Sequence, residues 1–311
     1  MNLLQIVQAT CGELGLNQPT NVIASSDLQI QQLLALANRD GNELWRVRDW
    51  TFLQKEYIIN LAEPITVVGD VTENSSTITN VSSVAGLSPQ IFAVQCDGAP
   101  QAQRISGASN AIGVTTVECE MEFTATAVQT EIQFLQDTYN LPDDFSHYIT
   151  NTWWDRTNHW MLIGPQSPQF DQWQRSGIVT TGPRRRWRQI GQQPTAYRIW
   201  PPPTAEDVPA ALVFEYVSSG WIETVGRTYI SQYAADTDVP LFDPQMHIQG
   251  IKWRFLQAKG MNYGDIQAEY VDFVQRAKAR DGGMPDLSLT RRKFPYLITS
   301  ANVQDGNFPG P

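Results

Sequence analysis

Tryptophan is concentrated in one stretch of the chain, residues 141–188, which holds five of the ten tryptophans together with a run of arginines. Large aromatic rings must be covered by other elements, and an indole N–H needs a hydrogen-bond partner when it is buried. Pro142 suits the first turn of a helix, and Asp143 and Asp144 can cap it. One helical face then follows, made of Phe145, Tyr148, Ile149, Thr152 and Trp153. We therefore expect a helix at the start of this stretch, followed by a partly buried aromatic interface.

Two runs in this stretch carry a resemblance to a known family. They are NTWWDRTNHWMLIGP at 151–165 and, after a short helix, SGIVTTGPRRRWR at 176–188. Both are similar to the head-to-tail adaptors of short-tailed bacteriophages, also called tail tubular protein A or tail accessory factor. The similarity extends more faintly over the N-terminal helices, the strand FLQKEYIINL and the C-terminal helices.

The resemblance implies a virion structural protein, although some members of the family have been linked to peptidoglycan cleavage. Adaptors of this family form a ring of about twelve subunits beneath the portal protein, closed by contacts of each copy with the next. Such a ring joins the capsid to the short tail and forms part of the channel through which genomic DNA passes without specific binding. Its implied partners are the portal, the tail nozzle or tail tube protein, and tail fibres. The implied locations are the head–tail junction of the virion and, during assembly, the host cytoplasm.

Helices are predicted at the N-terminal end of the chain. Residues 3–16 follow a helical apolar pattern that ends near Gly15. Ser26 and Gln29 have the spacing of a capping box at the start of a second helix. Gly41 is expected to kink or split that helix, at a cost of roughly 1 kcal/mol relative to alanine.

The remaining scaffold alternates between strand and helix patterns. Residues 51–61 read as a strand, and a second set of strands is expected in RRRWRQIG, TAYRIWPPP and AALVFEYVSSGWI. Towards the C-terminus, one helix begins at Asp243 and Pro244, and a further helix stops at Gly282.

Composition changes sharply between Pro64 and Leu135. This stretch has no Trp, Tyr or Lys, and its seven acids and single arginine, Arg104, give it a formal charge of −6. Short β-rich runs separated by turn residues indicate a small antiparallel β-module. Glu118, Glu120 and Glu122 are expected to alternate along one solvated, partner-facing or lumen-facing strand edge.

These patterns predict an α+β fold: a helical-bundle layer from the N- and C-terminal helices, antiparallel β-strands, an inserted small β-module and an extended C-terminal tail. The four expected parts are N-terminal helices and strand at 1–63, the acidic β-module at 64–135, the rest of the scaffold at 136–283, and the tail at 284–311.

Charge and cysteine content exclude several classes of protein. A net charge of −10 opposes general affinity for nucleic acid, because counterion release needs many Lys and Arg side chains facing phosphates. No apolar run is long enough to span a membrane, and the first residues lack the basic start of a signal peptide. The three cysteines, Cys11, Cys96 and Cys119, form no C-x-x-C pair, so reduced and mostly buried thiols are expected.

The motifs of common catalytic and metal sites are missing. The chain has no phosphate-binding glycine loop, no H-E-x-x-H and no G-x-S-x-G. The only histidines, His147, His159 and His247, are too far apart for a ligand pair on one turn, and His247 can contact Asp243 within a helical turn. We therefore expect no enzyme, no metal and no cofactor.

The arginine run Arg184–Arg188, interrupted by Trp187, has three interpretations. They are phosphate binding, a solvated strand edge, and a seam between subunits where arginine pairs with a neighbour's carboxylates and stacks on tryptophan. The seam is preferred because Arg and Trp are enriched at interfaces. The tail segment LTRRKFPYL has the same mixture and is expected to dock on the portal or on an adjacent subunit. The candidate interface residues are Trp153, Trp154, Arg156, Arg184, Arg185, Arg186, Trp187, Arg188, Arg291, Arg292, Lys293, Phe294 and Tyr296.

Two rival functions stay open at this stage. One is a peptidoglycan-degrading virion enzyme, which would need two carboxylates across a cleft. The other is a carbohydrate-binding tail-fibre or spike component, which exposed tryptophans would suit.

Overall fold

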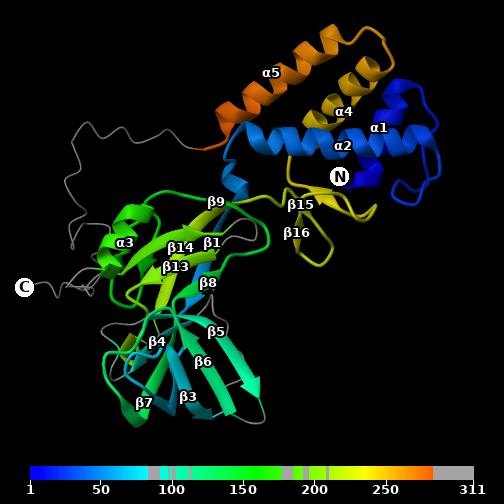
Figure 1. The fold of residues 1–311 in the computed structure, drawn as a ribbon. Coiled ribbons are helices and arrows are strands. Elements are labelled where there is room, and N and C mark those ends of the chain that lie inside the picture. Colours follow the sequence, from blue (N-terminus) through cyan, green and yellow to red (C-terminus); the bar gives the residue numbers. More distant parts are fainter. Residues whose placement is uncertain are drawn as a thin grey trace, which may run out of the picture. The chain divides into compact units, whose positions relative to one another are not determined.

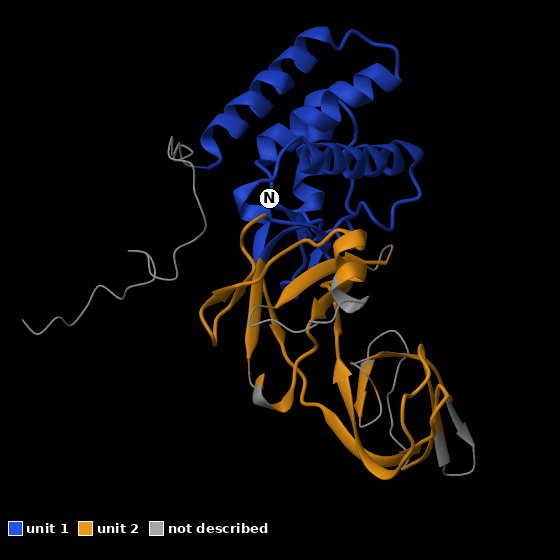
Figure 2. Cartoon of the chain, turned by 60° about the vertical axis from the view of Figure 1, so that its left-hand side comes forward, with its two compact units in different colours: residues 1–56, 144–149, 215–293 blue, residues 57–143, 150–214, 294–311 orange. Residues whose placement is uncertain are grey.

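The protein is described here from a computed structural model, which describes residues 1–82, 92–96, 99, 103–111, 114–176, 185–191, 196–207 and 210–282. The chain forms two compact units, coloured separately in Figure 2. The first unit comprises residues 1–56, 144–149 and 215–293, and the second comprises residues 57–143, 150–214 and 294–311.

Four helices from the two ends of the chain pack together in the first unit (Figure 1). They are α1 (Leu3–Leu14), α2 (Leu28–Val47), α4 (Pro244–Ala258) and α5 (Gly264–Arg280). Their apolar faces share one core, which includes Leu33, Trp221 and Ile251. A small antiparallel sheet in the order β16-β15-β17 accompanies them, made of β15 (Ile222–Glu223), β16 (Tyr229–Ile230) and β17 (Val239–Pro240).

Side-chain caps fix where these helices begin. Asn2 and Gln5 form a reciprocal capping box at the start of α1, with N–O distances of 3.0 and 3.1 Å. Asp27, one residue beyond the predicted Ser26, caps α2 by accepting from the Gln29 amide at 2.8 Å. The predicted capping box at Ser26 is therefore wrong, because the carboxylate of the next residue takes the free amide.

Gly41 neither kinks nor splits α2, contrary to the prediction from sequence. The helix runs without a break from Leu28 to Val47. A Cβ at Gly41 would lie 2.1 Å from a ring carbon of Trp221. The glycine is needed because an indole packs directly against the helix backbone at this point.

Two sheets form the part of the chain around the tryptophan-rich stretch. One has the order β1-β14-β10-β11, with β9 also pairing with β14, and the other has the order β12-β13-β8. The strands of the first are β1 (Gln54–Asn60), β9 (Phe145–Tyr148), β10 (Trp154–Asp155), β11 (Trp160–Met161) and β14 (Ala211–Ser218). Those of the second are β8 (Thr138–Asn140), β12 (Arg186–Ile190) and β13 (Ala196–Trp200). The remaining elements here are the helix α3 (Pro168–Ser176) and the single 3-10 turns η1 (Thr51–Leu53) and η2 (Ala205–Asp207).

The helix expected after Pro142 is a strand. Residues Phe145–Tyr148 form β9, which pairs antiparallel with β14 so that Tyr148 lies opposite Tyr216. Asp144 caps no helix, since its carboxylate accepts hydrogen bonds from Lys55 Nζ at 2.6 Å and from Tyr216 at 2.8 Å. The i, i+3, i+4 spacing was misleading because backbone pairing with a distant strand outweighed it.

A closed antiparallel barrel forms between Ile65 and Gln136, with the strand order β2-β3-β6-β5-β4-β7. Its strands are β2 (Ile65–Val71), β3 (Thr77–Ser82), β4 (Phe92–Cys96), β5 (Gln103–Ala111), β6 (Val114–Cys119) and β7 (Ala127–Gln136). Val117, Ile132 and Phe134 are fully buried in its interior. Because the sheet closes on itself, each of its described strands has a neighbour on both sides. Because β6 ends at Cys119, Glu120 and Glu122 lie beyond it, and the predicted alternation of three glutamates along one strand is wrong.

The predicted fold class is wrong. The helices from the two chain ends do share a core, but the described residues contain slightly more strand than helix, and a closed six-stranded barrel and two further sheets make the fold β-rich. The tryptophan-rich stretch, expected to add central helices to a bundle, is mostly strand and loop. Among the described residues, no helix has the length and apolar character needed to cross a bilayer.

Candidate functional site

Four aromatic side chains of the second unit, Trp153, Trp187, Tyr197 and Phe214, pack against one another. Trp153 lies 4.4 Å from Trp187 and 4.1 Å from Phe214, measured between ring centroids, and both pairs are stacked. Tyr197 meets Trp153 edge-on at 4.5 Å. Trp153 is only 1% exposed and Trp187 only 2% exposed. These two predicted interface residues therefore belong to the core of their own unit, and their rings are not available to a partner.

Carboxylates of the same chain hold two of the predicted interface arginines. Arg185 lies 2.5 Å from Asp207 and 3.6 Å from Asp155, and Arg188 lies 2.9 Å from Asp171. Partial burial raises the pKa of Asp207, but hydrogen bonds from Arg185 outweigh this and lower the pKa overall. The carboxylate partners that the sequence analysis expected on a neighbouring subunit are thus supplied within one chain.

An exposed aromatic patch lies beside these ion pairs. We define it by Ile163, Phe170, Trp173 and Arg186. Trp173 is 66% exposed and its ring lies 5.4 Å from that of Phe170, one helical turn earlier on α3. The guanidinium of Arg186 lies 5.2 Å from the ring centroid of Phe170. Ile163 and Phe170 also line a shallow recess of about 400 Å³.

Ile163 and Phe170 were not predicted from the sequence as interface residues. The signal available was the spacing of Phe170 and Trp173, three residues apart on a short helix that starts with a proline. Of the remaining predicted residues, Trp154 is half-buried on β10 and Arg156 is exposed. Arg184 and the tail residues Arg291, Arg292, Lys293, Phe294 and Tyr296 lie outside the described residues.

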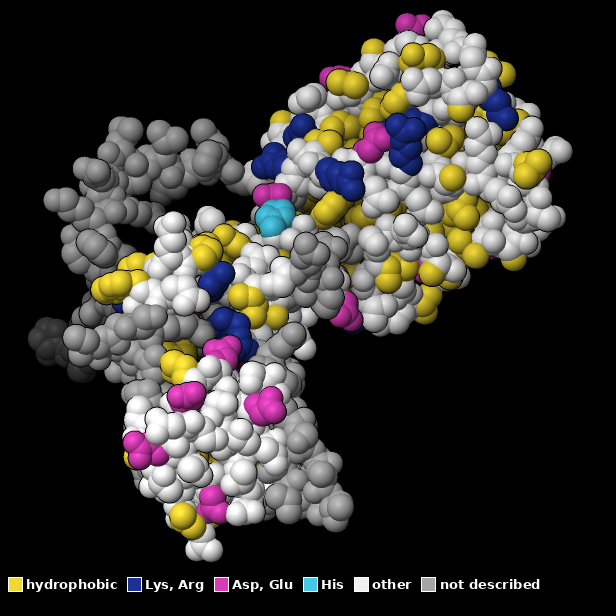
Figure 3. Space-filling view, in the orientation of Figure 1, with side chains coloured by type: hydrophobic (Ala, Val, Ile, Leu, Met, Phe, Trp, Pro, Cys, Tyr) yellow, Lys and Arg dark blue, Asp and Glu magenta, His cyan; other side chains and the backbone are white. Residues whose placement is uncertain are grey.

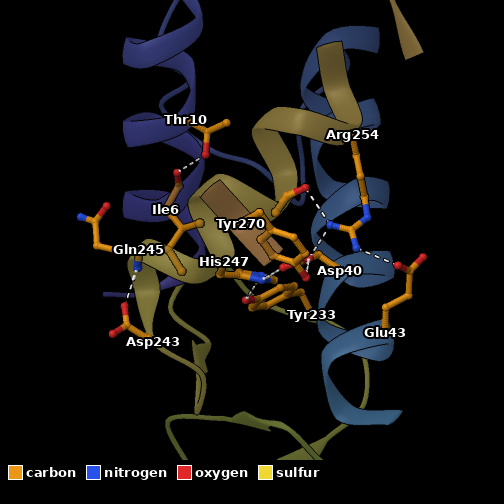
Figure 4. A network of polar contacts seen from close by, with 11 residues as sticks. Ile6, Thr10, Asp40, Glu43, Tyr233, Asp243, Gln245, His247, Arg254 and Tyr270 are labelled. Atoms are coloured by element: carbon orange, nitrogen blue, oxygen red, sulfur yellow. Dashed lines mark hydrogen bonds and ion pairs between the residues drawn. The ribbon is translucent and has the colours of Figure 1, made fainter. Parts of the chain in front are cut away.

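A second candidate site is a buried polar network in the helical unit (Figure 4). The carboxylate of Asp40 on α2 accepts hydrogen bonds from His247 Nδ1 at 2.6 Å, Arg254 Nη1 at 2.5 Å and the Tyr270 hydroxyl at 2.8 Å. Gly250 on α4 makes this approach possible, since a Cβ there would lie 2.2 Å from the Asp40 carboxylate. The imidazole of His247 therefore contacts Asp40. Its contact with the predicted partner Asp243 is through the backbone, where the His247 amide donates to the Asp243 carbonyl at 3.1 Å, and the Asp243 carboxylate caps α4 by accepting from the Gln245 amide.

The network contains the residue types of an acid–base relay, but a substrate could not reach them. Because a carboxylate can only accept, His247 Nδ1 donates to Asp40, and Nε2 of His247 lies 3.1 Å from the Tyr233 hydroxyl. Asp40 and His247 have no exposed surface, and burial raises the pKa of Tyr233 far above its ordinary value. An enclosed hydroxyl with a raised pKa is a poor nucleophile, so the arrangement is suited to joining α2, α4 and α5.

Other chemistry-bearing residues are dispersed. Within the described ranges, no group of three or more His, Cys, Asp or Glu side chains could hold a metal ion. Cys11, Cys96 and Cys119 form no disulfide with one another, and burial raises the pKa of Cys119 to about 12. His147 lies 3.2 Å from Asp49.

In comparisons with known proteins, no family model matches the sequence and no curated protein matches it.

Proposed function

We propose that this protein is a virion structural subunit, the head-to-tail adaptor of a short-tailed bacteriophage. In this role it forms a ring beneath the portal, connects the capsid to the tail, and surrounds part of the DNA channel. The resemblance of residues 151–165 and 176–188 to the adaptor family supports the identity. Copies of one chain arranged head to tail close into a ring when each presents one face to a different face of the next.

The aromatic patch carries the proposal. Trp, Phe and Arg are the residue types enriched where protein surfaces bury each other, and Trp173 exposes most of its ring on a helix whose neighbours hold it in place. Arg188 fixes α3 to β12 through Asp171, so the patch is presented by ordered elements. We assign this patch, in place of the buried Trp153 and Trp187, to the contact with an adjacent subunit or with the portal.

The charge of the barrel also supports a place beside DNA without affinity for it. Residues 64–135 carry seven acids, and their one basic residue, Arg104, is buried beside Asp137. On the face drawn in Figure 3 the barrel region shows Asp and Glu side chains among uncharged ones. Like charge removes the phosphate attraction that would slow DNA in the channel.

Native mass spectrometry of the purified protein mixed with portal from the same virion tests the proposal. The expected result is one complex of portal ring and adaptor ring with fixed stoichiometry. Trp173→Ala should reduce the bound fraction at least about tenfold, the effect of a central interface aromatic. Val225→Ala is the matched control, because Val225 is 80% exposed and lies in the other unit. Absence of any complex with portal contradicts the adaptor function.

Carbohydrate binding is the second candidate, because an exposed indole such as that of Trp173 can stack on a sugar ring. A glycan array separates the two functions. Binding that disappears in Trp173→Ala, together with failure to join portal, would support a tail-fibre role.

A further inference from the structure

The aromatic patch carries a projecting side chain and a recess side by side. Trp173 is the projecting side chain, and it is 66% exposed. The recess of about 400 Å³ is lined by residues 163–167 and by Phe170. The ring of Phe170 also lies 5.4 Å from that of Trp173, so one aromatic ring separates the projection from the recess. A surface that carries both parts can pair with a second copy of itself.

The recess is suited to an aromatic side chain. Its apolar lining comes from Ile163, Pro165 and Phe170, and Ile163 and Phe170 are each more than 40% exposed. The amide of Gln166, which also lines it, already donates to the carbonyl of Trp187 at 3.0 Å and so ties the wall to β12. Pockets of about 300–1,000 Å³ hold whole small molecules, so an indole can enter a recess of this size.

The charge of the patch also favours an aromatic partner. Arg185 and Arg188 are paired with carboxylates, but Arg186 forms no ion pair with any described residue. The guanidinium of Arg186 instead lies 5.2 Å from the centroid of the Phe170 ring. A cation in this position attracts the face of a further ring, and tryptophan is the best of these partners. The exposed tryptophan that the patch itself offers is Trp173.

We propose that, in the free protein, the aromatic patch pairs with the same patch of a second copy about a two-fold axis. Trp173 of each copy enters the recess of the other, where its indole lies against Arg186, and the two Phe170 rings meet near the axis. The aromatic rings then separate the two guanidinium groups.

This pairing differs from the contact with a ring neighbour or with portal, and it does not depend on the adaptor function. Because it covers the same side chains, the dimer must separate before the patch contacts either of those partners. A contact that has to separate must be weak, and the area of the patch agrees with this. From their exposed fractions, Ile163, Phe170 and Trp173 would bury roughly 300 Å² on each copy, about half of what stable complexes need.

Sedimentation velocity of the purified protein, over a range of about 5–200 µM, tests the pairing without any partner. The expected result is a mass that rises with concentration from one copy towards two and no further. A central interface aromatic contributes at least about tenfold to affinity, and a two-fold dimer contains the contact twice. Trp173→Ala should therefore weaken dimerisation about a hundredfold.

Ile163→Asp places a charge in the recess and should weaken dimerisation by a similar factor, because the carboxylate would lose its water under the indole. Val128→Asp is the matched control, since Val128 is 71% exposed on the barrel strand β7, and it should dimerise like the wild type. Far-UV circular dichroism checks that each variant is folded. Because Trp173 is mostly exposed, its replacement by alanine still tests the proposal if Ile163→Asp does not fold.

Mixing Trp173→Ala with Ile163→Asp tests the exchange itself. The first variant keeps an intact recess and the second keeps Trp173, so a mixed dimer retains one of the two contacts. Native mass spectrometry separates mixed from unmixed dimers by mass, and the mixed dimer should form about tenfold more tightly than either variant with itself.

Three results would overturn the proposal. They are a wild type that stays monomeric over the whole concentration range, a Trp173→Ala variant that dimerises like the wild type, and wild-type particles larger than a dimer, which would mean that the copies join head to tail. Portal is absent from these measurements, so their outcome is separate from that of the portal-binding test.

Discussion

The carboxylate of Asp40 joins three helices through donors from His247, Arg254 and Tyr270. Asp40→Asn keeps the size of the side chain but removes its charge, leaving the buried guanidinium with Glu43 as its only carboxylate partner among the described residues. Breaking a buried ion pair from one side costs about 3–5 kcal/mol. We expect a loss of this size in the free energy of unfolding of the helical unit, measured by urea denaturation with far-UV circular dichroism.

Asp272→Asn is the matched control for that substitution. Asp272 pairs with Arg276 one turn away on α5, and both side chains are more than half exposed. An exposed pair of this kind contributes about 0.3–0.5 kcal/mol. If Asp40→Asn cost no more than this control, the network would not be what joins the helices.

Gly41 and Gly12 give opposite expectations for the same substitution. Alanine at either helix-interior glycine gains up to about 1 kcal/mol from helix propensity. At Gly12 the new Cβ would meet only Gln18 at 3.5 Å, so Gly12→Ala should stabilise. At Gly41 it would lie 2.1 Å from the Trp221 ring, so Gly41→Ala should destabilise by about 1–3 kcal/mol despite the propensity. Thermal unfolding of the two variants tests both expectations. If both substitutions stabilised the protein, the Trp221 indole would have to move aside easily.

At the scale of elements, Asp144 ties the start of β9 to β1 and β14. Its carboxylate accepts from Lys55 at 2.6 Å, Ser218 at 2.6 Å and Tyr216 at 2.8 Å. Burial alone raises its pKa, but these hydrogen bonds outweigh burial and lower the pKa below the ordinary value of 3.8. A lowered carboxylate pKa stabilises the fold above pH 3.8, and this stability is lost as the pH falls through the folded-state pKa.

Asp144→Asn should therefore destabilise the protein at pH 7 by about 1.5–3 kcal/mol, the range for hydrogen bonds to a charged group. The difference from wild type should shrink as the pH falls below 3.8, because the wild-type carboxylate then becomes neutral as well. Urea denaturation at several pH values measures it. A difference that stayed constant down to pH 2 would mean that packing, not charge, explains the loss.

Local signals in the sequence located several helix ends but few contacts. Gly15 and Asp243 were recognisable as a helix end and a cap because each acts on its own neighbours. The Asp40–His247 contact was not recognisable, since 207 residues separate the two partners and the sequence around one of them gives no indication of the other. For the same reason β9 looked helical, because its partner strand β14 begins more than sixty residues later.

The candidate site was predictable in part. Residue types placed an arginine–aromatic surface in the stretch 141–188, and the exposed patch of Phe170, Trp173 and Arg186 lies there. Which tryptophans face inward was not predictable, because Trp153 and Trp187 are enclosed by Phe214 and Tyr197 from other strands. Burial of an aromatic ring depends on which sheets meet, and that is a property of topology.

At the scale of the whole molecule, charge is distributed so that the barrel accounts for more than half of the net charge of −10. Glu118, Glu120 and Glu131 are exposed on it. Replacing these three with lysine changes the net charge to −4, as each substitution adds two positive charges. Long-range repulsion of a polyanion should fall accordingly, and the new lysines can contact phosphates directly.

We expect the wild-type protein to show no retention of double-stranded DNA at about 0.15 M salt, and the triple lysine variant to bind it. Each phosphate contact adds about −0.9 to the slope of log K against log salt, so the variant should show a slope of about −2 to −3. Fluorescence anisotropy with a labelled duplex across a salt series measures both. Three glutamates replaced by glutamine separate the two causes, since this variant loses repulsion without gaining contacts and should bind more weakly than the lysine variant. Tight, salt-sensitive binding by the wild type would contradict the proposal that DNA passes the acidic barrel without binding to it.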